Sequence, residues 1–189
     1  GLPIPATAEA VVLGYVLPPE KITVEEGPFG ECTGYFSEKQ RGLVVKVTKI
    51  LYRSNPIIHG VIPIRGSIIR SSYLGAHLLT SALIWNDLEH IVSGIKGVYA
   101  LYQTCQVGPS ILVISIESQY PGQVMRTALA ALSSEAGARY VKVIIVVDED
   151  IDISSFEEVA WALASRVDPE RDAQIICGVP GFSLDPAIP

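Results

Sequence analysis

The sequence predicts an α+β protein in two parts, a β-rich first half followed by a layer of alternating strands and helices. Short apolar runs separated by glycine and proline fill residues 1–70, whereas strand and helix patterns alternate over residues 71–189. The 189 residues are 49% hydrophobic and 18% charged, which is typical of a well-packed globular protein rather than a disordered one. We place the boundary between the two parts near residues 66–76.

The first part is expected to contain several short strands. Glu9–Leu17 is rich in valine, leucine and tyrosine and ends at two prolines, and Lys21–Glu25 alternates weakly. Leu43–Tyr52 alternates between apolar and polar residues as a half-buried strand does, and Ile57–Ile62 is an apolar run between two prolines. Strands interrupted this often by glycine and proline favour a small barrel or sandwich.

The second part alternates between helical and extended patterns. Helices are predicted over Ser71–Asn86, Pro121–Ala136 and Ser154–Arg166, and strands over Gly97–Gln103, Ile111–Ser115, Tyr140–Val147 and Asp172–Cys177. Pro121 suits a first helical turn, and Ser154 or Ser155 suits an N-cap. Alternation of this kind indicates an α/β layer.

Composition and spacing exclude several classes of function. The net charge of −6 and the lack of a basic run argue against nucleic-acid binding. No apolar stretch has the length of a membrane span, and no signal-peptide pattern is present. The three cysteines, Cys32, Cys105 and Cys177, are too dispersed for a metal or redox motif, so we expect a reducing, cytoplasmic location.

The chain begins Gly1-Leu2-Pro3 rather than with methionine. We therefore expect it to be processed or to belong to a longer polypeptide.

The most informative stretch places two acids, Glu26 and Glu31, around Gly27, Pro28 and Gly30. In a regular strand the two carboxylates would point to opposite faces, so only a backbone reversal would bring both to one site. Glycine and proline favour such a turn. A pair of acids on a turn suits proton transfer, although the spacing alone also fits a surface turn with solvated glutamates.

Two other charged stretches have plainer interpretations. The acids of Asp148–Asp152 are expected to end a strand and cap the following helix rather than to bind a metal. The charges of Arg166–Asp172 are expected to form a salt-bridged turn after that helix.

The acid stretch and five other motifs resemble, in order, the motifs of the UbiD-type reversible decarboxylases. The stretch Glu26–Glu31, followed by Thr33-Gly34-Tyr35, resembles the family's acid signature. The others are Pro5–Glu9 with Gly14-Tyr15, Tyr52–Ile57, Tyr120–Gln123, Val146–Asp152 with Trp161-Ala162, and Arg166–Asp172. The matches span nearly the whole chain.

The resemblance implies a specific chemistry. Members of this family use prenylated FMN to remove or add CO2 on aromatic or α,β-unsaturated acids. By motif position, Glu31 would be the proton donor, and Glu26 would bind the family's catalytic arginine and tune the local charge. Tyr73 and Leu74 match a family stretch that lies against the flavin. The resemblance does not identify the substrate or the direction of the reaction.

The resemblance also implies a fold and a partner. Residues 1–70 would form part of a flavin-reductase-like split β-barrel, and residues 71–189 an α/β C-terminal domain. The family's arginine, its manganese and potassium ligands and most flavin-phosphate contacts fall in an upstream segment without a counterpart here. We therefore expect no metal ligand in this chain, and an oligomer in which a companion polypeptide carries that segment and contacts Leu2–Tyr35.

Two alternatives stay open. The chain would be a non-catalytic assembly subunit if it only docks a partner, or a flavin-reductase-like protein if it oxidises nicotinamide. The presence of both Glu26 and Glu31 favours an enzyme, because a scaffold would not need both acids.

Overall fold

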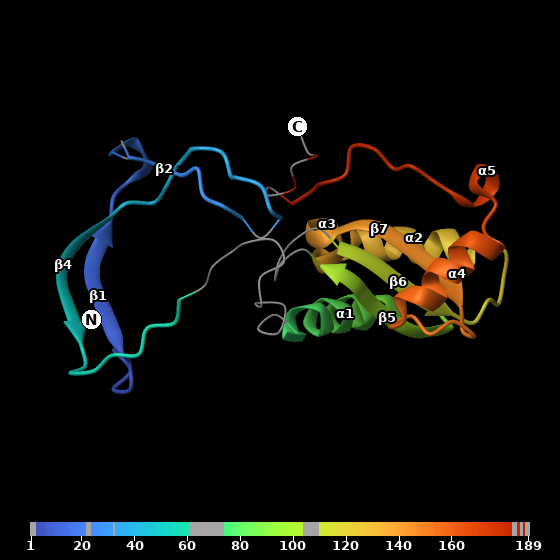
Figure 1. Ribbon diagram of the computed structural model, residues 1–189, viewed down its shortest axis with the longest axis horizontal. Helices are drawn as coiled ribbons and strands as arrows, with labels where there is room; N and C mark the ends of the chain where they lie inside the picture. The colour runs from blue at the N-terminus through green and yellow to red at the C-terminus, as the bar shows by residue number, and fades with distance from the viewer. Residues whose placement is uncertain are drawn as a thin grey trace. The chain divides into compact units, whose positions relative to one another are not determined.

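A computed structural model describes residues 3–21, 24–31, 33–60, 74–103, 110–182, 185 and 187 (Figure 1). The chain divides into two compact units. The first comprises residues 1–31 and 35–63, and the second comprises residues 32–34 and 64–189. Each unit is described by itself below.

The main ladder of the first unit joins β1 (Ala10–Val16) and β4 (Val45–Tyr52) in antiparallel register. The register shifts between Leu13 and Gly14, where a side chain on Gly14 would clash with the carbonyl oxygen of Lys46. Glycine therefore allows the two backbones to approach closely at this bulge. A 3-10 turn, η1 (Pro19–Lys21), follows β1.

A second, shorter ladder joins β2 (Glu25–Glu26) and β3 (Gln40–Arg41), with Glu25 opposite Arg41 and Glu26 opposite Gln40. The described residues of the first unit thus form two separate two-stranded sheets. They include no closed barrel, so the split barrel stays a prediction. Residues 57–60 of the expected strand at Ile57–Ile62 belong to no strand, and the last two lie outside the described residues.

None of the described side chains of the first unit is buried. Every residue of β4 is exposed, including Val47, Ile50 and Tyr52, the last with 73% of its surface accessible. A two-stranded ribbon is marginally stable in water without a packed apolar face. The alternation in the sequence predicted a half-buried strand, but all eight residues of β4 are exposed, and no described residue of the first unit covers them.

The second unit has a three-stranded sheet in the order β5-β6-β7, formed by β5 (Ile95–Gln103), β6 (Ser110–Ile116) and β7 (Val141–Asp148). β5 and β6 are antiparallel, and β6 and β7 are parallel. The helices are α1 (Leu74–Glu89), α2 (Gln123–Ser133), α3 (Glu135–Tyr140), α4 (Phe156–Arg166) and α5 (Pro169–Asp172). The α+β class is therefore confirmed.

Two apolar clusters fill the two sides of this sheet. On one side Leu112 and Ile114 of β6 pack with Ile84 and Leu88 of α1 and with residues of α2. On the other side Val113 packs with residues of α4. Successive strand residues point to opposite faces, so β6, which is buried along nearly all its length, contributes to both clusters.

The sequence placed most elements of this unit correctly, with two errors. The predicted helix at Pro121–Ala136 breaks at Ser134, which leaves the helical backbone region and caps α3 by accepting from Gly137 N–H at 3.0 Å. The predicted strand at Asp172–Cys177 is wrong, because Asp172 ends α5 and residues 173–177 are extended without a ladder partner. Ile175 is 92% exposed there. A short apolar run predicts a strand only where a free strand edge is in hydrogen-bonding reach.

The residues after this extended segment are fastened to β7. Lys142 Nζ lies 2.7 Å from Asp185 Oδ2, and Ala187 N–H donates to Asp185 Oδ1 at 3.0 Å. The Asp185 side chain is only 5% exposed. Burial alone would raise the pKa of Asp185, but the hydrogen bonds from Lys142 and Ala187, together with the lysine charge, lower it.

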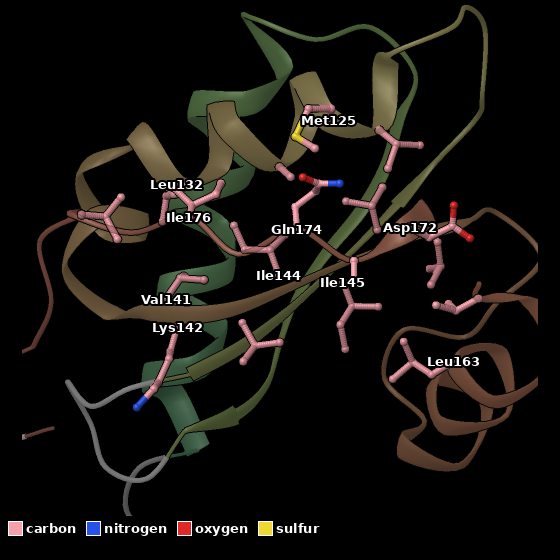
Figure 2. A pocket seen from close by; sticks show the side chains of 18 of the residues that line it. Met125, Leu132, Val141, Lys142, Ile144, Ile145, Leu163, Asp172, Gln174 and Ile176 are labelled. Atoms are coloured by element: carbon pink, nitrogen blue, oxygen red, sulfur yellow. The ribbon is translucent and has the colours of Figure 1, made fainter. Parts of the chain in front are cut away.

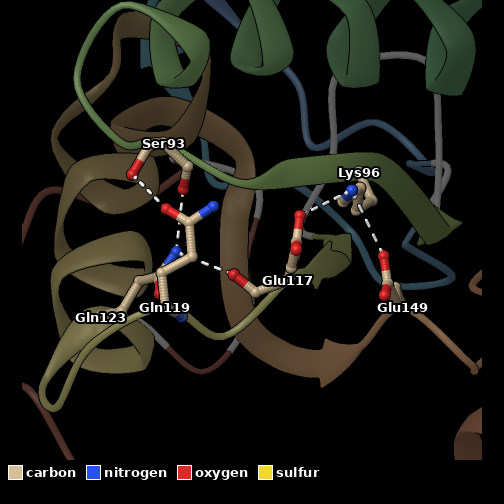
Figure 3. A network of polar contacts seen from close by, with 6 residues as sticks. All are labelled: Ser93, Lys96, Glu117, Gln119, Gln123 and Glu149. Carbon is tan, nitrogen blue, oxygen red and sulfur yellow. Dashed lines mark hydrogen bonds and ion pairs between the residues drawn. The ribbon is translucent and has the colours of Figure 1, made fainter.

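A polar network holds the start of α2 (Figure 3). Gln123, which is 1% exposed, donates from Nε2 to the carbonyl oxygens of Ser93 and Glu117 at 2.8 and 3.2 Å. Its Oε1 accepts from Gln119 N–H at 2.6 Å. In the same view Lys96 lies between Glu117 and Glu149, at 2.8 and 3.3 Å, and these hydrogen bonds raise the pKa of Lys96. The Tyr120–Gln123 motif therefore has a structural role, because Gln123 joins the loop between α1 and β5 to the loop between β6 and α2.

Among the described residues, no helix is both long and apolar enough to cross a membrane.

Candidate active site

Glu26 ends β2 and is followed by a sharp backbone turn. Gly27 has a φ of 86°, in the left-handed region that favours glycine, and a side chain there would lie 3.1 Å from the carbonyl oxygen of Glu38. Gly27 therefore adopts a backbone angle that is unfavourable for residues with a side chain. Gly30 has an ordinary φ.

Glu31 lies near the tip of a hairpin that we call the acid hairpin, formed by residues 25–41. Ser37 N–H donates to the carbonyl oxygen of Phe29, and Glu31 N–H to that of Tyr35, both at 2.8 Å. Gly30 and Phe36 form an isolated bridge between these bonds. These contacts register the two arms and fix the backbone of Glu31.

The reversal of the chain therefore differs in place from the expected one. The sequence interpretation put it between the two acids, whereas both acids lie on the same arm and the chain turns back after Glu31, where Gly34 has a φ of 87°. Proline and glycine at positions 27–30 bend the first arm. Because this arm is paired with the second arm as far as Glu31, the chain can reverse only after Glu31. That both carboxylates meet at one site stays a prediction.

The two carboxylates differ in exposure. Glu26 is exposed and Glu31 is half-buried. Neither carboxylate forms an ion pair with any residue that the structure describes.

The predicted flavin contacts lie at the limit of the described chain. Tyr73 is outside the described residues. Leu74 begins α1, but its side chain is also outside them.

Aromatic side chains beside the acids would suit contact with the ring of a flavin. Exposed aromatic side chains flank the acids on the acid hairpin: Phe29, Tyr35 and Phe36 are 53, 61 and 77% accessible. Such surfaces suit a planar aromatic ring. Within the described part of the chain, no group of three or more histidine, cysteine, aspartate or glutamate side chains is placed to hold a metal ion.

The two charged stretches have structural roles, although the predicted acid cap of α4 is wrong. Asp148 ends β7 as expected, but the N-cap of α4 is Ser155, whose side chain accepts from Glu158 N–H. Asp152 accepts from Ser154 N–H and Oγ at 2.9 and 2.7 Å, which lowers the pKa of Asp152. Arg166 donates two hydrogen bonds to Asp150, at 2.9 and 2.6 Å, which lowers the pKa of Asp150. The Asp148–Asp152 stretch thus leads into α4 and fastens its far end. In the turn after α4, Arg171 Nε bonds Asp172 at 2.8 Å.

A hollow that sequence reasoning missed lies along β7 in the second unit (Figure 2). It has a volume of about 1600 Å³ and is bounded by β7, α2, α4 and the extended residues after α5. Met125, Leu132, Ile144, Ile145, Leu163 and Ile176 are among its lining residues. In the sequence these residues match ordinary core positions, so no signal marks the hollow. Its lining is mainly apolar and also includes three acids, Asp148, Asp172 and Asp185.

Two family models match the chain. The 3-octaprenyl-4-hydroxybenzoate carboxy-lyase Rift-related domain, UbiD, matches residues 1–66, and the C-terminal domain of the same family matches residues 73–189. A phenolic acid decarboxylase of Sedimentibacter hydroxybenzoicus is 36% identical over 185 residues, which are 97% of this chain and 37% of that protein.

Solved structures agree. The vanillic acid decarboxylase of the same organism, in open form, superposes with a TM-score of 0.83 at 33% identity, over 98% of this chain and 38% of that one. The UbiD-class enzyme HmfF of Pelotomaculum thermopropionicum, in complex with FMN, superposes with a TM-score of 0.80 at 33% identity, over 98% of this chain and 39% of that one. The chain thus spans well under half the length of these relatives. It belongs to the UbiD family of carboxy-lyases.

Proposed function

We propose that this chain supplies the acid pair of a decarboxylase that uses prenylated FMN. The observation that carries the proposal is the acid hairpin: Glu26 and Glu31 lie on one arm, on either side of the positive-φ Gly27, and neither forms an ion pair with a described residue. The relatives support it, because they are decarboxylases and one of them was solved with prenylated FMN.

In this proposal Glu31 is the proton donor. When bound, the flavin supplies the electron sink for cleavage of the bond between the carboxylate and the substrate carbon. CO2 leaves, Glu31 transfers its proton to that carbon, and Glu31 takes a new proton from solvent. A donor must lie about 2.6–3.2 Å from the atom that it protonates, and the backbone bonds of Glu31 hold it in a fixed arm for this step.

Glu26 has the supporting role. We propose that it binds an arginine from the companion polypeptide and keeps that charge beside Glu31. A cation near two acids offsets their mutual repulsion and so sets the pKa of the donor. Tyr73 and Leu74 are proposed to contact the flavin, and the manganese and potassium ions to bind mainly to the companion.

The companion is also required to complete the first unit. We propose that residues 1–70 are part of a split β-barrel whose other strands the companion supplies. The exposed apolar residues of β1 and β4 support this, because unpaired strand edges must be covered to avoid aggregation. The solved vanillic acid decarboxylase is itself named as an assembly, ShVdcCD. The dispersed cysteines favour the cytoplasm for this assembly.

The proposed substrates are phenolic acids, on the names of the relatives. The test uses this chain assembled with its companion and prenylated FMN, and offers vanillic acid and 3,4-dihydroxybenzoic acid. We expect CO2 release and, in D2O, exchange of deuterium into the product.

Glu31→Gln is expected to lower both rates by about 100-fold or more while the flavin stays bound, because an amide cannot donate the proton. Glu89→Gln, at an exposed acid that ends α1 outside the expected companion contact, is the matched control and should keep the full rate. An unchanged rate in the Glu31→Gln enzyme would favour the assembly-subunit alternative. Oxidation of NADH without CO2 release would favour the flavin-reductase alternative.

A further inference from the structure

Gly42 lies just after β3, on the arm of the acid hairpin opposite Glu26. A β-carbon built on Gly42 would lie 2.6 Å from Cδ, 2.6 Å from Oε1 and 3.0 Å from Oε2 of Glu26. Its three nearest neighbours are therefore all atoms of one carboxylate. The Glu26 side chain occupies the space that any other residue at position 42 would fill.

The backbone does not explain this glycine. Gly42 is not among the described glycines with positive φ, so an alanine there would meet no conformational penalty of that kind. At Gly14, by contrast, the nearest atom to an added β-carbon belongs to the backbone of the partner strand, which identifies a strand-packing role. What Gly42 provides is room for a side chain.

The register explains why this side chain is Glu26. β2 and β3 are antiparallel, and Glu26 pairs with Gln40, two residues before Gly42. Diagonal neighbours across a ladder are within reach of long side chains. Gly27 sets the backbone direction on one side of Glu26, and Gly42 leaves the space on the other.

We propose that Gly42 is a positioning residue for the carboxylate of Glu26, an inference that rests on the proposed function of the acid pair. With alanine at position 42, the carboxylate must move by roughly 0.8 Å or more to regain an ordinary contact of 3.4 Å. Glu26 ends in a flexible side chain, so it moves while the backbone stays. A shift of about 1 Å in a catalytic group can cost about 100-fold in rate.

The activity test uses the assembled enzyme with vanillic acid and 3,4-dihydroxybenzoic acid. We expect Gly42→Ala to lower kcat by about 10- to 100-fold. Gly60→Ala is the matched control, because a β-carbon there has no neighbour within 4 Å, and it should change kcat by less than about twofold.

A second background separates positioning from general damage. In a Glu26→Ala enzyme the methyl group at position 42 has nothing to displace, so Gly42→Ala should then cost less than about twofold in residual kcat. An equal loss in both backgrounds would show that Gly42 acts through the fold and would overturn the proposal.

A readout without turnover completes the test. The side-chain carboxyl 13C resonance of Glu26, assigned from its loss in Glu26→Gln, is expected to shift in Gly42→Ala and not in Gly60→Ala. If the Glu26 carboxyl resonance has the same position in the wild type, in Gly42→Ala and in Gly60→Ala, the inference is overturned. Full activity of both Glu26→Ala and Glu31→Gln would refute the acid pair itself, whereas an inactive Glu26→Ala with a fully active Gly42→Ala would refute only the role of Gly42.

Discussion

At Gly27 the backbone of the acid hairpin enters the left-handed region between the two glutamates, with a φ of 86°. An alanine there would pay about 1–2 kcal/mol for its β-carbon and would approach the carbonyl oxygen of Glu38 at 3.1 Å. We expect Gly27→Ala to speed hydrogen exchange at Glu31 and Ser37 N–H by about 5- to 30-fold.

Gly30→Ala is the control for this measurement. Its φ is ordinary and its nearest neighbour, the Phe36 ring, is at 4.0 Å, so exchange should change little. Equal exchange in the two variants would show that the conformation of Gly27 does not hold the hairpin.

The Asp185 carboxylate makes the local stability of the residues around it depend on pH. Its pKa is lowered in the folded chain, so its stabilisation is present above the unfolded pKa of about 3.9 and is lost as the pH falls through the folded value. We expect the amide of Ala187, which donates to Asp185, to lose its protection from exchange as the pH falls below about 4. Asp185→Asn should abolish that dependence. A wild-type amide equally protected at pH 6 and pH 2 would contradict this account.

Among the elements, α2 depends on one buried amide. Gln123→Leu would leave the carbonyl oxygens of Ser93 and Glu117 and the N–H of Gln119 without their partner. We expect it to lower the free energy of unfolding by about 2–4 kcal/mol in urea denaturation of the whole chain. Gln119→Leu removes a side chain from an exposed hydrogen bond with Ser93 and should cost less than about 1 kcal/mol. A similar loss of unfolding free energy in both variants would show that the buried Gln123 amide contributes no more than the exposed Gln119 amide.

How far the sequence predicts the structure also depends on the element. β6 and α4 follow from local patterns, because periodicity and the Ser155 cap are local properties. The break at Ser134 and the unpaired segment after Asp172 do not, because both depend on contacts distant in sequence. For the candidate site, motif position predicts the two acids, and their roles stay a proposal. The place of the reversal and the space at Gly42 emerge only from the pairing of β2 with β3.

At the scale of the whole molecule, the two units differ in how they are stabilised. The second has an apolar core on both faces of its sheet, whereas the first has no buried residue among those described. Apolar side chains exposed on both strands of the β1–β4 ribbon are a surface that another chain or segment must cover. The stability of the first unit is therefore expected to depend on its partner.

The last prediction concerns the chain purified by itself. We expect amides of β1 and β4 to exchange about 100-fold faster than those of β6, because local opening is cheap where few apolar contacts hold a strand. The chain alone should self-associate, bind little prenylated FMN and release no CO2. Adding the companion should restore protection in β1 and β4 and leave β6 unchanged, so β6 is the internal control. Hydrogen exchange, mass in solution, flavin absorbance and CO2 release measure these outcomes. A soluble monomer that binds the flavin and decarboxylates a phenolic acid unaided would show that residues 1–70 need no partner, since the exposed strands would then be stable and the acids active alone.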